Sequence, residues 1–161
     1  MTLNEYNKCV DLFSDNVYRF ILKSTKDEAL AKDIVQDSYE KLWLNHQNVN
    51  FLKVKSYLFS VAYHTMIDNF RKLKYVANQD NIQYNNHFHN EQYSDISEIL
   101  NQAVSMLPAD QQSALLLRDY EGYSYKEIAE ITGLNEAQVK VYIYRARVFL
   151  KNYLVKIENI A

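Results

Sequence analysis

The sequence predicts an all-α fold: two small helical domains joined by a flexible linker, with a helix-turn-helix domain at the C-terminal end. Only two glycines and one proline occur among 161 residues, so the residues that favour tight turns between strands are scarce. Apolar residues recur at three- and four-residue spacing along most of the chain, as on the buried face of a helix. That pattern stops in the asparagine-rich segment 76–95. We therefore expect domains at 1–76 and 95–161, with the linker at 77–94.

Three helices are expected in the first domain. The first lies near 3–24, and the third covers about 54–75 after a loop at 45–50. The second helix runs to about position 44. Its start is predicted by the T-x-x-E capping-box pattern of Thr25 and Glu28. The apolar spacing places the lone Trp43 on the buried side of this helix.

The second helix also carries an acidic face. Because residues three and four apart lie on the same side of a helix, four polar residues share this face: Asp33, Gln36, Asp37 and Glu40. They are predicted to be exposed.

The second domain begins with two helices. One is expected at 95–106. The next starts at Pro108, which suits the first turn of a helix, and runs to about position 120, where Gly122 stops it.

The segment "SYKEIAEITGLNEAQVKVYIYRARVFL" then predicts a helix-turn-helix unit. Ser124 and Glu127 form a capping box, Gly133 is suited to end the helix that follows, and Asn135 with Gln138 repeats the box. A turn this short forces the two helices to cross steeply.

Charge is unevenly distributed, although the net charge is only −2. Segment 42–79 has five basic residues and one acidic residue, segment 137–157 has five basic residues and no acidic one, and segment 94–136 carries eight acids against two bases. Two solvated basic faces would explain the pattern, and so would two local contacts with a polyanion.

The last helix has the layout of a DNA-reading helix. Its inner side is predicted to hold Val139, Ile143 and Ala146, and the other side is free for a major groove. Polar and apolar side chains there suit base edges and thymine methyl groups, and arginines suit phosphates. The candidate contacts are Gln138, Lys140, Val141, Tyr144, Arg145 and Arg147. A plain helical hairpin with a solvated basic side is the alternative.

Several classes of function are not supported by the residues. Cys9 is the only cysteine, so no internal disulfide forms, and a reduced cytoplasmic setting fits. We expect no metal site, because His87 and His89 have no carboxylate or cysteine at ligand spacing. No nucleophile motif or phosphate-binding loop occurs, so we expect no cofactor and no enzymatic activity.

Three stretches resemble the extracytoplasmic-function (group 4) sigma factors of the sigma-70 family. "LPADQQSALLLRDYEGYSYKEIAEITGLNEAQVKVYIYRARVFL" is similar to their region 4, "AKDIVQDSYEKLW" to region 2.2, and "SYLFSVAYHTMIDNFRK" to regions 2.3 and 2.4. The stretches occur in the family's order and cover nearly the whole chain except the linker. The resemblance implies a subunit of bacterial RNA polymerase that directs promoter-specific initiation of transcription.

The resemblance also implies three contact sites. The acidic face of the second helix would bind the core polymerase, and the recognition helix would read the minus-thirty-five element. The third helix would bind the melted minus-ten strand, where aromatic side chains can stack on bases. Its candidate residues are Tyr57, Tyr63, His64, Arg71 and Lys72. The family often has an anti-sigma factor as a further partner.

Two other functions remain open from the residues alone. A two-domain helix-turn-helix regulator would bind DNA without recruiting polymerase, and it would not need the acidic helix face. A helical adaptor protein would fit the low net charge, and its affinity for DNA would not fall steeply with salt.

Overall fold

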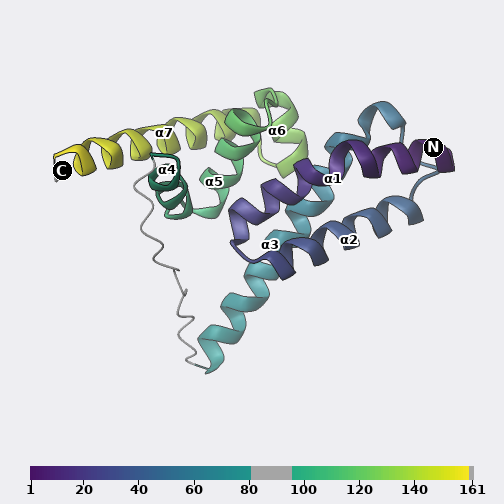
Figure 1. Ribbon diagram of the computed structural model, residues 1–161, viewed down its shortest axis with the longest axis horizontal. Coiled ribbons are helices and arrows are strands. Elements are labelled where there is room, and N and C mark those ends of the chain that lie inside the picture. Colours follow the sequence, from purple (N-terminus) through teal and green to yellow (C-terminus); the bar gives the residue numbers. More distant parts are fainter. Residues whose placement is uncertain (81–95, 160–161) are drawn as a thin grey trace.

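The computed structural model describes residues 1–80 and 96–159. All the regular elements in these two ranges are helical, which confirms the predicted all-α fold. The first group of helices consists of α1 (Leu3–Thr25), α2 (Glu28–Leu44), the short 3-10 helix η1 (Phe51–Lys53) and α3 (Val54–Asp80). The three long helices α1, α2 and α3 pack against one another. Figure 1 shows the lower end of α3 projecting away from the other helices.

The start of α2 corrects one prediction. Lys26 adopts a left-handed conformation with φ 55°, which ends α1 and places Asp27 at the N-cap of α2. The Asp27 carboxylate accepts a hydrogen bond from the Leu30 amide at 3.1 Å. Thr25 is instead the last residue of α1 and donates its hydroxyl hydrogen to the Ile21 carbonyl at 2.9 Å. The predicted Thr25–Glu28 capping box is therefore wrong.

The third helix is longer than predicted. It continues to Asp80, so the first residues of the expected linker are helical. Once a helix is established, each added residue gains a hydrogen bond, and asparagine costs only a few tenths of a kcal/mol. The rest of the expected linker, including His87 and His89, lies outside the described residues.

The second group of helices surrounds α7. Its elements are α4 (Ile96–Ser105), α5 (Ala109–Leu115), the π-helical turn η2 (Leu116–Tyr120), α6 (Tyr125–Thr132) and α7 (Glu136–Glu158). Pro108 is the N-cap of α5 and not its first helical residue. The expected single helix from Pro108 to Tyr120 becomes π-helical in its last five residues, where the Glu121 amide donates to the Leu116 carbonyl at 3.1 Å.

The two groups share one hydrophobic core. Helix α3 packs against α6, and α1 packs against α4 and α5. Phe59 of α3 stands between Phe20 of α1 and Tyr123 of the second group, with ring centroids 5.6 and 5.4 Å away. The chain is thus folded back on itself, so that residues more than 60 positions apart are neighbours (Figure 1).

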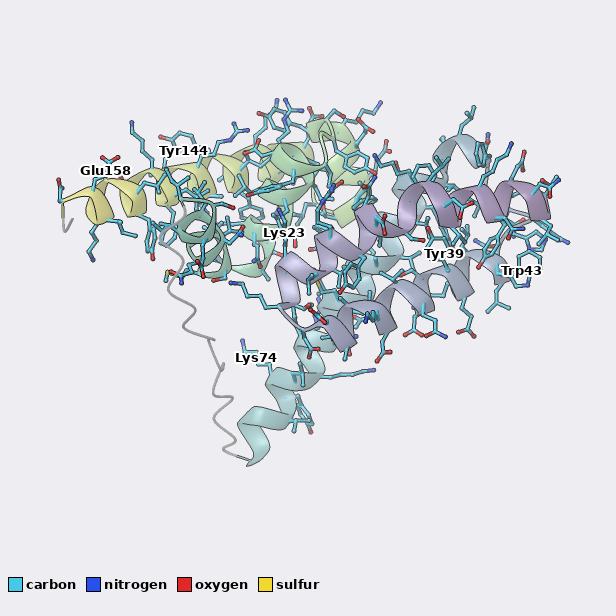
Figure 2. The ribbon with its side chains drawn as sticks, in the orientation of Figure 1. Lys23, Tyr39, Trp43, Lys74, Tyr144 and Glu158 are labelled. Atoms are coloured by element: carbon cyan, nitrogen blue, oxygen red, sulfur yellow. The ribbon has the colours of Figure 1, made fainter. Side chains whose placement is uncertain are left out.

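Polar contacts reinforce this boundary. Arg19 of α1 binds the Glu121 carboxylate through two nitrogens, and the nearest pair of atoms is 3.0 Å apart. The ammonium group of Lys23 lies 3.5 Å from the centroid of the Tyr120 ring. Figure 2 shows Lys23 where α1 meets the second group of helices. Only 3% of the Glu121 side chain is exposed, so its charge depends on compensation, which comes chiefly from the direct ion pair with Arg19 and also from the nearby Lys23.

Two further findings concern membranes and metals. Within residues 1–80 and 96–159, no helix combines the length and apolar character needed to cross a bilayer. The same ranges hold no cluster of three or more His, Cys, Asp or Glu side chains suited to a metal ion.

Candidate nucleic-acid interface

The helix-turn-helix unit is built by three local devices. Ser124 and Glu127 exchange side-chain and backbone hydrogen bonds, both 3.1 Å long, at the start of α6. Gly133 ends α6 with φ 79°, a conformation that costs glycine little, and its amide donates to the Ala129 carbonyl at 2.9 Å. Asn135 and Gln138 form the second reciprocal box at 2.8 and 3.1 Å. Both predicted capping boxes are confirmed, and they fix where α7 begins.

One face of α7 is open to solvent. Val139, Ile143 and Ala146 are fully or almost fully buried, as predicted. The opposite side exposes all six candidate residues: Gln138, Lys140, Val141, Tyr144, Arg145 and Arg147. Tyr144 is 69% exposed, and Figure 2 shows it on the outer edge of the long helix. The structure therefore brings these residues together on the surface of one helix.

The Gln138 side chain can cap the helix and donate to a base at the same time. Its Oε1 atom accepts the Asn135 amide hydrogen, which holds the side chain in place at the first turn of α7. The Nε2 amino group is not needed for this contact and can donate to a base edge. The capping box therefore positions the donor that sequence reasoning assigned to base recognition.

The basic residues of α7 differ in their partners. The Lys140 ammonium is 3.9 Å from the Glu136 carboxylate, one turn earlier. Arg147 binds Asp119 of η2 through Nη2 at 2.6 Å and Nε at 3.3 Å. Arg145 has no ion pair with any residue that the structure describes. Of the three basic candidates on α7, Arg145 is accordingly the one most available to a phosphate.

The residues predicted for the minus-ten strand do not share one surface. Arg71 and Lys72 are exposed on the projecting end of α3, and His64 is exposed nearer the middle. Tyr57 is half-buried, and its hydroxyl accepts a hydrogen bond from the Asn45 amide at 3.4 Å.

Tyr63 is only 4% exposed, because the second group of helices covers it. Its hydroxyl donates to the Asp110 carboxylate at 3.4 Å. Burial, together with the Asp110 charge, raises the pKa of Tyr63 to about 12. In this arrangement Tyr63 cannot stack on a base.

The acidic face of α2 is exposed as predicted. Ile34, Ser38 and Leu42 are buried on the inner side, which directs four side chains outward: Asp33, Gln36, Asp37 and Glu40. The polar face from Asp33 to Glu40 is continuous over about two turns of helix.

Trp43 is not in the core, which corrects a further prediction. It is 41% exposed at the end of α2, stacked on the His46 ring at 4.5 Å and in edge contact with Tyr6 at 5.1 Å. Helical spacing placed it on the inner side, but α2 ends at the next residue, beyond the packed part of the bundle. Figure 2 shows Trp43 at one extremity of the molecule.

Comparison with known proteins decides the family. Residues 9–75 match the family described as Sigma-70 region 2, and residues 97–150 match Sigma-70, region 4. The chain is 33% identical to the ECF RNA polymerase sigma factor SigM of Bacillus subtilis (strain 168) over 156 residues, which are 94% of each protein. The chain belongs to the extracytoplasmic-function sigma factors of the sigma-70 family.

Other relatives agree. The RNA polymerase sigma factor SigV of the same bacterium is 31% identical, with 92% of this chain and 90% of SigV covered. Among solved structures, the sigma factor RpoE of Bartonella quintana, in complex with the anti-sigma factor NepR, is similar with a TM-score of 0.81. That similarity has 25% identity and covers 94% of this chain and 98% of RpoE. The sigma factor therefore directs initiation of transcription, and the regulator and adaptor alternatives are not favoured.

Sequence reasoning missed the residues that join the two halves of this sigma factor. Arg19 and Glu121 are 102 positions apart, and neither belongs to a motif that predicts a partner. Asp119 was likewise counted only as part of an acidic segment, although it binds Arg147. No periodicity in the sequence signals such contacts, because they depend on how the helices are arranged.

Proposed function

We propose that the exposed face of α7 binds the minus-thirty-five element of the promoter as a duplex. One observation carries this proposal: Gln138, Val141 and Tyr144 are exposed together on a helix whose first turn is fixed by a capping box. Arg145 binds a phosphate, and Lys140 and Arg147 lie on the flank of the same helix. Gln138 donates to a base edge, and Val141 contacts a thymine methyl group.

For the minus-ten element, we propose that the two halves of the chain separate before the strand binds. His64, Arg71 and Lys72 are exposed in the folded-back arrangement, whereas Tyr63 is covered. Once the halves part, Tyr57 and Tyr63 become available for stacking on unpaired bases, and the two basic residues bind the backbone. Simultaneous use of both halves on one promoter raises the effective concentration of each site.

The acidic face of α2 is the proposed contact with core RNA polymerase. Asp33, Asp37 and Glu40 form a row of negative charge, which is complementary to a basic surface on the enzyme. The protein acts in the cytoplasm as an initiation factor and not as an enzyme. Because the similar RpoE was solved with an anti-sigma factor, we also propose an anti-sigma partner for this chain.

Selection of bound sequences from a duplex pool tests the minus-thirty-five proposal. Arg145→Ala should weaken binding to all sequences alike, because a phosphate contact is independent of sequence. Gln138→Ala should change which bases are selected. Lys32→Ala, on the exposed surface of α2, is the control and should change neither. Equal effects of Gln138→Ala on all sequences would contradict the assignment of base reading to this residue.

Charge reversal tests the polymerase contact. Replacing Asp33, Asp37 and Glu40 by lysine should abolish binding to core polymerase and leave duplex binding by α7 intact. Reversal of three other exposed acids, Asp11, Asp15 and Glu28, is the matched control. If the control set reduces polymerase binding as much as the first set, general charge and not the α2 face is responsible.

A further inference from the structure

The π-helical turn η2 places an acidic side chain against the DNA-reading helix. Its wide turn, closed by the bond from the Glu121 amide to the Leu116 carbonyl, precedes the glycine turn before α6. Asp119 from this turn reaches Arg147 of α7, where Oδ1 lies 2.6 Å from Nη2 and Oδ2 lies 3.3 Å from Nε. The carboxylate thus occupies one complete edge of the guanidinium group.

The surroundings of this pair favour an anion. The ring of Tyr125, the first residue of α6, lies under two more cations: Arg118 at 4.7 Å and Lys140 at 5.7 Å. Arg118 comes from η2, whereas Lys140 and Arg147 both belong to α7, and the two elements meet beside the exposed face of α7. Three positive side chains gathered beside the proposed reading face form an attractive position for a phosphate of the duplex backbone.

Asp119 and a phosphate would bind the same edge of the Arg147 guanidinium group. The side edge of arginine, made of Nε and Nη2, binds a carboxylate or a phosphate with two parallel hydrogen bonds, and only one of them fits at a time. Arg147 is 49% and Asp119 38% exposed, so water and salt weaken their attraction and the pair can be exchanged. The hydrogen bond to Asp119 raises the pKa of Arg147. An arginine side chain stays charged with either partner.

We propose that Asp119 is an internal counter-ion that competes with a DNA backbone phosphate for Arg147. It keeps the affinity of α7 for duplexes below the value that its basic residues alone would give. The inference rests on the proposed binding of duplex DNA by α7, and it adds a residue that regulates the strength of that binding. Since a backbone contact carries no sequence information, Asp119 affects affinity and leaves base preference unchanged.

A double-mutant cycle tests the competition. The full chain is titrated with a short fluorescent duplex of fixed sequence over a range of salt concentrations. Asp119→Asn, which keeps the shape of the side chain, should tighten binding about three- to fivefold, the range set by weak exposed ion pairs. Because one more phosphate contact forms, the dependence of log affinity on log salt should steepen by about one unit.

Introducing Asp119→Asn into the Arg147→Ala variant distinguishes competition for Arg147 from general repulsion between Asp119 and DNA. If Asp119 acts by holding Arg147, its replacement gains little once Arg147 is absent. Glu130→Gln removes an exposed acid of α6 that has no ion pair among the described residues, so its effect should be equal in both backgrounds. Thermal unfolding of each variant checks that the folded state is retained.

Each outcome bears on the inference. A gain from Asp119→Asn that persists without Arg147 would overturn it in favour of simple charge repulsion. Weaker binding by Asp119→Asn would also overturn it, because Asp119 would then orient Arg147 toward DNA. If the wild-type chain shows no salt-dependent duplex binding at all, the proposed function itself fails. If the wild-type chain binds duplexes with the expected salt dependence but the cycle shows no coupling between Asp119 and Arg147, only the proposed role of Asp119 fails.

Discussion

Tyr63 of α3 donates its hydroxyl hydrogen to Asp110 of α5, across the boundary between the two halves of the chain, with 3.4 Å between the oxygens. A side chain expected to meet the promoter is therefore used inside the protein. The arrangement that covers Tyr63 also buries Phe59 and Tyr123 against each other. For Tyr63 to bind the minus-ten strand as proposed, the contacts that join the halves would first have to open.

Tyr63→Phe should change how stability depends on pH. The pKa of Tyr63 is raised from 10.0 to about 12, so the folded protein keeps a proton that the unfolded chain releases. The resulting stabilisation is complete below about pH 10 and is lost as the pH rises toward 12. Urea unfolding at about pH 9 and about pH 11 should show the wild type losing about 1.3 kcal/mol more unfolding free energy than Tyr63→Phe over this interval. Parallel losses in both proteins would argue against the raised pKa.

Arg19→Ala should loosen the boundary between the two halves. It leaves the buried Glu121 carboxylate without its ion-pair partner, so we expect the free energy of unfolding to fall by about 1–2 kcal/mol. The loss is smaller than for a fully buried pair because Arg19 is half exposed. Hydrogen exchange should accelerate in α1 and in the turn around Glu121. The double variant Arg19→Ala, Glu121→Gln should recover part of the lost unfolding free energy, since no buried carboxylate is then left without a cation. Failure of the second change to restore any stability would contradict this explanation.

Removing either confirmed capping box should destabilise the helix-turn-helix unit. Ser124→Ala and Asn135→Ala each leave helix amides without a partner, and each should cost about 1 kcal/mol in thermal unfolding. Asn152→Ala, at an exposed interior position of α7, is the control and should be neutral or slightly stabilising. Asn135→Ala should also weaken base selection, because Gln138 loses the partner of its Oε1 atom. Unchanged selection would show that this contact does not position Gln138.

Gly133→Ala tests whether backbone conformation or space limits the turn. A β-carbon at Gly133 would lie 3.9 Å from Cε1 of His64, an ordinary contact, so no steric clash is expected. The left-handed φ of 79° nevertheless disfavours alanine, and we expect a loss of about 1 kcal/mol in unfolding free energy. Gly133→Asn should cost less, because asparagine tolerates this conformation. Equal losses for both variants would point to crowding by His64 instead.

The parts of the fold that were predictable are those fixed by neighbouring residues. Ser124 with Glu127 and Asn135 with Gln138 are three positions apart, so their hydrogen bonds follow from helix geometry alone. The acidic face of α2 and the buried stripe of α7 follow from helical periodicity in the same way. Thr25 misled the prediction because Lys26 takes a left-handed conformation, which shifts the cap to Asp27.

The remaining features depend on contacts between distant segments. Tyr63 lies on the third helix as expected, but its burial requires that the second half of the chain folds over it. The pairing of Asp119 with Arg147 depends on the π-helical turn, which no local pattern in the sequence announces. Such placements follow from the packing of whole helices and not from spacing along the chain.

Transcription in vitro tests the central claim most directly. Core RNA polymerase, a template carrying a promoter selected by this chain, and the purified protein are combined, and run-off transcripts are measured. We predict transcripts only when the protein is present, a strong reduction with Arg145→Ala, and none when Asp33, Asp37 and Glu40 are reversed to lysine. Transcripts of equal amount with and without the protein would contradict its assignment as the promoter-recognition subunit.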